Sequence, residues 1–271
     1  RGAFEKILPK NNTLAVLMSG LLGAVFPVCE CAVVPVIRRL VKNGLPVSCA
    51  LAYMLAAPIF NPVTAISTYK AFNNSPEITI SRLAMGYMIA VFIALIVARK
   101  AHSFFLKASV KAENGDDHHH PRNLNAALNN SLRDLMDVGL YFCIGVVLTA
   151  ILKTTVIDPT DDFWKELANN SIVGSIGMMF LAFVLSLCST SDAFIAANFH
   201  NFKYGPKLAF MVFGPMMDAK LIFLYSTVFK WKFILFLFVA IFILTGALSI
   251  LFETRILPGW MSQQTEILLA P

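Results

Sequence analysis

Long stretches without a charged residue constrain this chain more than any other feature of its sequence. Several of them approach the ~20 residues that cross a bilayer as a helix. Only 14% of the residues are charged, against about 25% in soluble domains. The apolar/polar alternation of barrel strands is missing, so we predict an all-α, polytopic integral membrane protein. The uncharged runs are Thr13–Val28, Leu45–Tyr69, Leu83–Ala98, Val138–Leu152, Ser171–Ser191 and Phe233–Phe252, and Leu208–Phe229 contains two charges.

The net charge of +6 lies mostly in short loops, which indicates topology and contact with membrane lipids rather than nucleic acid. Arg38, Arg39 and Lys42, and a second basic group between residues 99 and 122, mark loops that we expect in the cytoplasm. The acidic loop 153–170 is then expected outside, although this assignment also puts the basic residues 230 and 232 outside. We expect a multi-pass protein of a bacterial inner or plasma membrane.

A polar segment divides the chain into a first transmembrane repeat, 1–107, a cytoplasmic linker, 108–123, and a second repeat, 124–271. The linker contains His118, His119 and His120, which form a weak candidate metal site. A solvated linker without a ligand is the alternative interpretation. The five cysteines lie in or beside apolar runs, which is not the pattern of a disulfide framework.

Three features recur in the same order in both halves, at offsets of 157 to 159 positions. They are an Asn-Asn pair, then a cysteine, and then a proline that is followed three residues later by Asn61 in the first half and by Asp218 in the second. This pattern predicts two copies of one broken-helix unit. The second half has an additional apolar run before its Asn-Asn pair, so we expect about 4 + 4 helices, with the first helix absent from this chain. An even number of helices in each unit would make the two repeats parallel.

Prolines mark the predicted breaks, because a proline inside a helix leaves the carbonyl four residues earlier without its partner. In a membrane such carbonyls are tolerated only where they face protein or a water-filled cavity. We therefore expect the substrate to bind near the breaks at Pro35, Pro58, Asn61, Pro62 and Pro215.

The triplet Cys29-Glu30-Cys31 is the strongest candidate for chemistry. On a regular helix the two thiols would point about 200° apart, so joint binding of one ion requires an unwound or extended triplet. If a half-helix starts here, its N-terminus favours thiolates, which bind soft metals and metalloids, and the carboxylate is a possible third ligand. The alternative is that both cysteines are small buried hydrophobic residues.

Polar and charged residues interrupt the apolar runs of the second half as well. Ionisable residues at membrane depth are costly and usually functional. The alternatives are that Asp218 and Lys220 neutralise each other or that the lysine extends to the interface. The candidate binding residues here are Cys188, Ser189, Ser191, Asp192, Asp218 and Lys220.

The motifs Phe26-Pro27-Val28-Cys29-Glu30-Cys31, Ala56-Ala57-Pro58-Ile59-Phe60-Asn61-Pro62, Leu187-Cys188-Ser189-Thr190-Ser191-Asp192 and Phe213-Gly214-Pro215-Met216-Met217-Asp218 resemble those of the predicted permease family that includes organoarsenical efflux permeases. The resemblance covers nearly the whole chain. It implies an eight-helix protein and export of trivalent organoarsenicals. It also implies a possible second permease subunit as partner.

We therefore expect a secondary transporter, not an enzyme, that exports a soft, thiol-reactive solute such as a trivalent organoarsenical or a metal ion. Glu30, Asp192 and Asp218 would supply charge or proton coupling. The chain contains no phosphate-binding or hydrolase motif, and no cofactor is expected. Two alternatives remain open: a divalent-metal, zinc-type permease subunit that works with a partner, and a membrane thiol-redox enzyme or non-transporting scaffold subunit.

Overall fold

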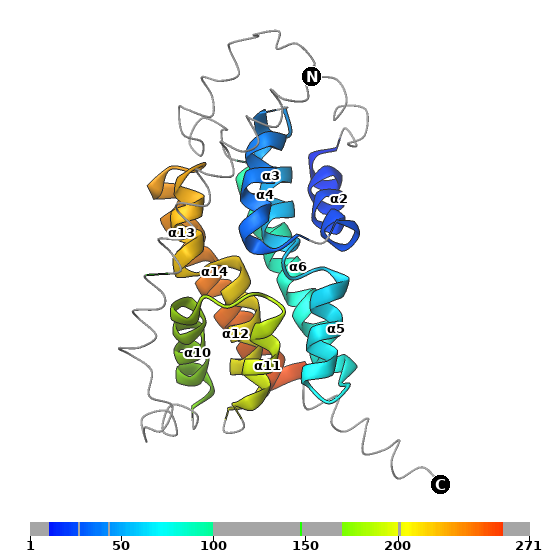
Figure 1. Ribbon diagram of the computed structural model, residues 1–271, viewed down its shortest axis with the longest axis vertical. Helices are drawn as coiled ribbons and strands as arrows, with labels where there is room; N and C mark the ends of the chain where they lie inside the picture. The colour runs from blue at the N-terminus through cyan, green and yellow to red at the C-terminus, as the bar shows by residue number, and fades with distance from the viewer. Residues whose placement is uncertain are drawn as a thin grey trace.

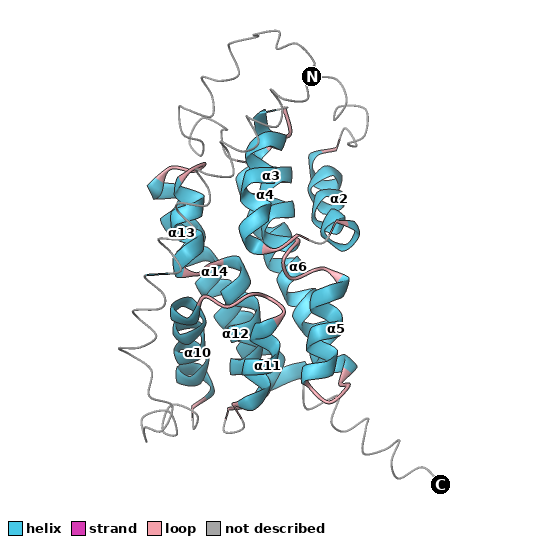
Figure 2. Ribbon diagram, viewed as in Figure 1, coloured by secondary structure: helices cyan, strands magenta, loops and turns pink. Residues whose placement is uncertain are grey.

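A computed structural model describes residues 11–26, 28–42, 44–99, 147, 170–199 and 202–256. The regular structure within these ranges is helical, as Figure 2 shows, and this confirms the predicted all-α class. Three helical stretches have the length and apolar composition to cross a membrane: Pro76–Ala98, Tyr204–Ser226 and Trp231–Arg255.

The two halves of the described chain contain the same succession of helices (Figure 1). The first half consists of α2 (Asn12–Val25), α3 (Glu30–Lys42), α4 (Val47–Ala56), α5 (Pro62–Ala71) and α6 (Pro76–Ala98). The second half consists of α10 (Ser171–Leu185), α11 (Ser191–Asn198), α12 (Tyr204–Met216), α13 (Ala219–Ser226) and α14 (Trp231–Leu251), which continues into the π-helix η2 (Phe252–Ile256).

The first two helices of each half enter the protein and return without crossing it. The end of α2 lies at the end of α4, because the Tyr53 hydroxyl donates to the Phe26 carbonyl and a Cβ added at Gly23 would meet Ala57. Hence α2 and α4 run in the same direction, and α3 between them runs back. In the second half Gly214, late in α12, likewise faces Ala182, late in α10. Re-entrant segments of this kind are found in membrane proteins where the non-helical tip is buried in protein or lines a cavity.

The third and fourth helices of each half form one broken span, α4–α5 in the first half and α12–α13 in the second. Helix α3 packs against α4 and also against α13, whereas α11 packs against α12 and also against α5. We call α2 with α3, and α10 with α11, the re-entrant pairs. Each re-entrant pair therefore lies beside the first segment of the broken span of its own half and beside the last segment of the broken span of the other half. The two broken spans must run antiparallel, and Figure 1 shows α3, α4 and α13 toward one end and α5, α11 and α12 toward the other.

This arrangement corrects the predicted parallel relation between the repeats. The sequence interpretation counted every apolar run as a crossing, but α2 with α3, and α10 with α11, make none. The even number of crossings on which the parallel prediction rested therefore does not hold. Most of the predicted span Val138–Leu152 and the whole linker 108–123 lie outside the described residues, so the domain boundaries stay a prediction.

The inverted arrangement also changes the distribution of charge between the two sides. The α13–α14 turn, with Lys230 and Lys232, lies on the same side as Arg38 and the end of α6 at Arg99. The sequence interpretation had put residues 230 and 232 on the opposite side. Their position beside the other basic residues agrees with the rule that positive charge collects in the cytoplasm, so we assign this side to the cytoplasm.

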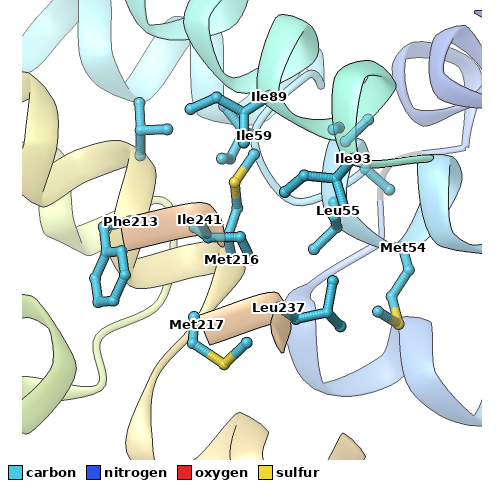
Figure 3. Close-up of a cluster of buried hydrophobic side chains, with 14 of the residues drawn as sticks. Met54, Leu55, Ile59, Ile89, Ile93, Phe213, Met216, Met217, Leu237 and Ile241 are labelled. Carbon is cyan, nitrogen blue, oxygen red and sulfur yellow. The ribbon is translucent and has the colours of Figure 1, made fainter. Parts of the chain in front are cut away.

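The hydrophobic core lies where the two halves meet. Helix α6 packs against α12 and α14 as well as against its own half. Figure 3 shows buried side chains of both halves in one cluster, including Ile59 and Met217 from the two breaks. Because residues of both broken spans share this core, a movement of either break must be transmitted to the other half.

Candidate functional site

Each re-entrant pair ends in a non-helical tip that carries an exposed, free cysteine, Cys29 in the first half and Cys188 in the second. The two residues have the same backbone role. The carbonyl of each accepts hydrogen bonds from the amides three and four residues later, at 3.1 Å for Cys29 and 3.0 Å for Cys188, and so starts the following helix. A half-helix, the condition named for thiolates at the Cys29-Glu30-Cys31 triplet, thus begins here. Cys49, by contrast, is buried within α4.

The predicted metal sites lie partly outside the described residues. The backbone of Cys31 belongs to α3, but its side chain, like His118, His119 and His120, lies outside what the structure describes. In the described part of the chain no three His, Cys, Asp or Glu side chains come together as metal ligands. Whether Cys29, Glu30 and Cys31 hold one ion stays a prediction.

The prolines end or begin helices at three of the predicted breaks. Helix α4 ends before Pro58, Pro62 is the first residue of α5, and Pro215 lies in the last turn of α12, just before the non-helical Met217 and Asp218. At Pro35, however, the predicted break is absent, because α3 continues through this residue to Lys42. A single missing hydrogen bond bends or weakens a helix without necessarily ending it.

An Asn side chain satisfies the backbone at the first break. Asn61 is the N-cap of α5, where its side-chain oxygen accepts from the Thr64 amide at 2.8 Å. Its amide nitrogen donates to the carbonyls of Ala57 at 2.9 Å and Pro58 at 3.1 Å. The Thr64 hydroxyl also donates to Pro58, at 2.9 Å. The Ala57 and Pro58 carbonyls at the break are thus paired within the protein, as a membrane interior requires.

An Asp side chain caps the second break and brings a charge with it. Asp218 Oδ1 accepts from the Leu221 amide at 2.7 Å and so caps α13. Its Oδ2 lies 3.4 Å from Lys220 Nζ, which lies 3.2 Å from Glu30 Oε1 at the start of α3 and donates to the Ser186 carbonyl at 2.9 Å. Ser186 ends α10 in the left-handed conformation, φ 46°. We name Glu30, Lys220, Asp218 and the Ser186 carbonyl the lysine cage.

The lysine cage is buried and contains two acidic groups but one basic group. Glu30 and Asp218 are 1% and 0% exposed, and Lys220 is 7% exposed. Glu30 Oε2 and Asp218 Oδ2 accept no hydrogen bond from any described residue. Two carboxyl groups share one ammonium, so the cage is neutral when one of them is protonated and carries one negative charge, which is costly at this depth, when neither is.

A second buried ion pair holds the tip of the other re-entrant pair. Arg82 Nη2 lies 2.9 Å from both carboxylate oxygens of Asp192 and 2.8 Å from the Ser189 carbonyl, and Nη1 donates to the Thr68 hydroxyl at 2.7 Å. The Ser67 hydroxyl donates to the Thr190 carbonyl beside it. The Arg82 side chain is fully buried and Asp192 is 2% exposed. Ser191, the first residue of α11, is exposed, and its hydroxyl donates to the Cys188 carbonyl at 3.1 Å.

Sequence reasoning did not select Arg82, Ser67 or Thr68. Because the uncharged run was counted from Leu83, Arg82 was treated as a flank of the helix. The structure begins α6 at Pro76, six residues before Arg82, which places Arg82 inside the span. A proline at the first helical position is a common start signal, and it could have revealed this charge as intramembrane.

An open pocket of about 220 Å³ lies beside the first break, lined by Ala24, Phe60, Asn61, Pro62, Ala65 and Leu83. Counted from the caps of α2 and α10, Phe183 corresponds to Ala24; counted from the caps of α6 and α14, Phe238 corresponds to Leu83. In the second half these two rings stack edge to face, with centroids 5.7 Å apart. The pocket of the first half is therefore open at the place where, in the second half, two aromatic rings fill the corresponding space.

Comparisons with known proteins identify chains that are similar to this one. The family model ArsP_1, described as "Predicted permease", matches residues 2–254. UPF0718 protein YcgR of Bacillus subtilis is 38% identical over 255 residues, covering 90% of this chain and 84% of that protein. A "Putative two-component membrane permease complex subunit" of Streptococcus mutans is 32% identical over 235 residues, covering 85% of this chain and 77% of that protein. No solved structure matches the chain.

Proposed function

Because the chain belongs to the predicted permease family and contains helices long and apolar enough to cross a membrane, we propose that it is a secondary transporter that exports a soft, thiol-reactive solute. One observation carries this proposal: the inverted arrangement puts an exposed thiol at the tip of each re-entrant pair, Cys29 and Cys188. Thiolates bind soft metals and trivalent metalloids more readily than hard cations. Broken helices in inverted repeats form the binding sites of many secondary transporters.

The pocket beside Asn61 favours a solute with an organic group over a bare metal ion. Its walls are mostly apolar side chains, and its volume of about 220 Å³ is larger than a metal ion requires. A trivalent organoarsenical combines a thiol-reactive centre with such a group. We therefore propose this class as the first solute to test, with the Cys29 thiol at the reactive centre and the pocket at the organic group.

The Streptococcus relative is named as one subunit of a two-component permease complex, which favours a second candidate function. In that case this chain would be the membrane subunit of a two-protein permease, and the solute could be a divalent metal such as zinc. The described residues provide no three-ligand metal cluster to support zinc, so the partner is the stronger part of this alternative.

Transport by inside-out vesicles that contain the full-length protein tests the proposal. Trivalent methylarsenical, Zn²⁺ and Cu⁺ should be compared with and without a proton gradient, in wild type, Cys29→Ser and Cys188→Ser. Cys49→Ser is the matched control because its thiol is buried. We expect saturable uptake of the arsenical that falls at least about tenfold in Cys29→Ser. Zinc-only transport would favour the second candidate. Arsenical uptake that persists in both exposed-thiol variants would contradict the proposed role of the thiols.

A further inference from the structure

The lysine cage has the composition of an alkali-cation site. In broken-helix transporters, Na⁺ is coordinated by carbonyls at the ends of half-helices and in unwound segments, together with carboxylates. Here the Ser186 carbonyl at the end of α10, Glu30 Oε1 and Asp218 Oδ2 lie 2.9, 3.2 and 3.4 Å from one point, the Lys220 nitrogen. That point is where a bound cation would sit.

The charges of the cage indicate that it is built for a cation. Glu30 Oε2 and Asp218 Oδ2 are buried and accept no hydrogen bond within the described part of the chain. Two carboxyl groups at membrane depth require either a proton or a cation between them, because each ion carries a desolvation penalty of several kcal/mol. An ammonium group is a compact point charge with three donors, which suits three oxygens on three elements.

We propose that the lysine cage is a monovalent-cation site in which Lys220 is a tethered substitute for Na⁺. The ammonium joins the three broken elements in the way a coupling ion would, so the protein needs no alkali cation for stability. Removing the ammonium creates a site that Na⁺ or Li⁺ occupies. A consequence, which rests on the proposed function, is that transport by the wild-type protein is independent of Na⁺ and becomes dependent on it when the ammonium is removed.

A second buried lysine provides a matched control. Lys207 is also 7% exposed and lies in α12, the helix that precedes α13. Its nitrogen lies over the rings of Phe72 and Tyr204, 5.9 and 5.6 Å from their centroids. Loss of this ammonium should destabilise the protein without creating a set of carboxylate ligands.

Thermal unfolding of the purified full chain in detergent tests the cation site. Wild type, Lys220→Met and Lys207→Met should be compared in NaCl, LiCl and choline chloride at equal ionic strength. We expect Lys220→Met to have a lower Tm than wild type in choline, and to gain at least about 3 °C in 100 mM NaCl or LiCl. The Tm of wild type and the lower Tm of Lys207→Met should each be the same in all three salts. The double variant Glu30→Gln/Lys220→Met should lose the response to Na⁺.

Three outcomes would overturn the proposal. The first is a Lys220→Met Tm that does not depend on the cation. The second is a wild-type Tm that rises with Na⁺ as much as that of Lys220→Met. The third is aggregation of Lys220→Met in every salt with recovery only in the double variant, because Na⁺ would then not replace the ammonium. None of these measurements requires transport. A negative result would therefore contradict the cation site and leave the proposed transport of an arsenical to its own test.

Discussion

The ammonium nitrogen of Lys220 lies 3.2 Å from Oε1 of Glu30 across 190 positions of the chain, and the pair joins α13 of the second half to α3 of the first. Arg82 and Asp192 form the reciprocal link, from α6 of the first half to α11 of the second. Each re-entrant pair is thus tied to the opposite half by a buried ion pair. A movement that exposes the breaks to one side of the membrane must either break these links or carry both partners together.

The inverted arrangement predicts which turns share a side of the membrane. Single cysteines at Pro46, before α4, and at Lys230, before α14, should be labelled from the same side by an impermeant maleimide in a cysteine-free background. Cysteines at Ser75, before α6, and Lys203, before α12, should be labelled from the other side. Comparison of right-side-out with inside-out vesicles measures this. Labelling of positions 46 and 230 from opposite sides would contradict the inverted arrangement and support parallel repeats.

The sequence predicted the helical class and most of the breaks, because both depend on local properties. Charge-free runs report burial in lipid, and proline reports a missing hydrogen bond within four residues. The Asn61 and Asp218 caps occupy matching positions in the two halves, as the repeat offset of 157 indicated. These features can be found without knowing which helix lies beside which.

What the sequence did not reveal depends on contacts between distant segments. The partner of Lys220 in α3 and the partner of Asp192 in α6 are set by helix packing, and no spacing in one chain indicates them. The re-entrant path of α2 and α3 escaped notice because an apolar run has the same composition whether it crosses the membrane or returns. Since the direction of the second repeat depends on the number of crossings, this one misjudgement produced the parallel prediction.

Gly23 sets the distance between α2 and the first break. A Cβ at this position would lie 2.7 Å from the Ala57 Cα and 3.1 Å from its nitrogen. Backbone atoms cannot yield as a flexible side chain can, so we expect Gly23→Ala to lower the free energy of unfolding by about 1–3 kcal/mol. Thermal unfolding in detergent would measure the change.

Gly246→Ala is the control for this prediction. Its added Cβ would approach the flexible end of Met179 at 3.4 Å, an ordinary contact. Because alanine favours helix over glycine by up to about 1 kcal/mol, this variant should be neutral or slightly more stable. Equal destabilisation by both substitutions would show that the close approach at Ala57 is not the cause.

The pocket beside Asn61 predicts a change in solute preference. Ala24→Phe would place in the first half the ring that Phe183 supplies in the second, and so would fill the pocket. Uptake of an aryl-substituted trivalent arsenical should fall about tenfold or more, whereas uptake of the methyl compound should change much less. Ala84→Phe, at an exposed position of α6, is the control and should affect neither. If Ala24→Phe reduced uptake of both compounds equally while Ala84→Phe reduced neither, the result would argue against a pocket for the organic group.

Asp192→Asn should destabilise the protein more than the loss of any single surface charge. The substitution leaves the Arg82 guanidinium fully buried without its counter-charge, and breaking such a pair costs about 3–5 kcal/mol. Lys203→Gln breaks the pair between Lys203 and Glu253, in which the lysine side chain is 57% exposed, and should cost about 1 kcal/mol or less. Thermal unfolding of both variants compares the two losses.

The double variant Arg82→Met/Asp192→Asn separates the charge from the contact. If the penalty in Asp192→Asn comes from an unpaired guanidinium, removal of that group should restore part of the lost stability, because no buried charge remains. If the penalty comes from the hydrogen bonds to Ser189 and Thr68, the double variant should be at least as unstable as the single one, since methionine provides no donor. Recovery in the double variant would therefore identify charge neutralisation as the role of Asp192 at the tip of the second re-entrant pair.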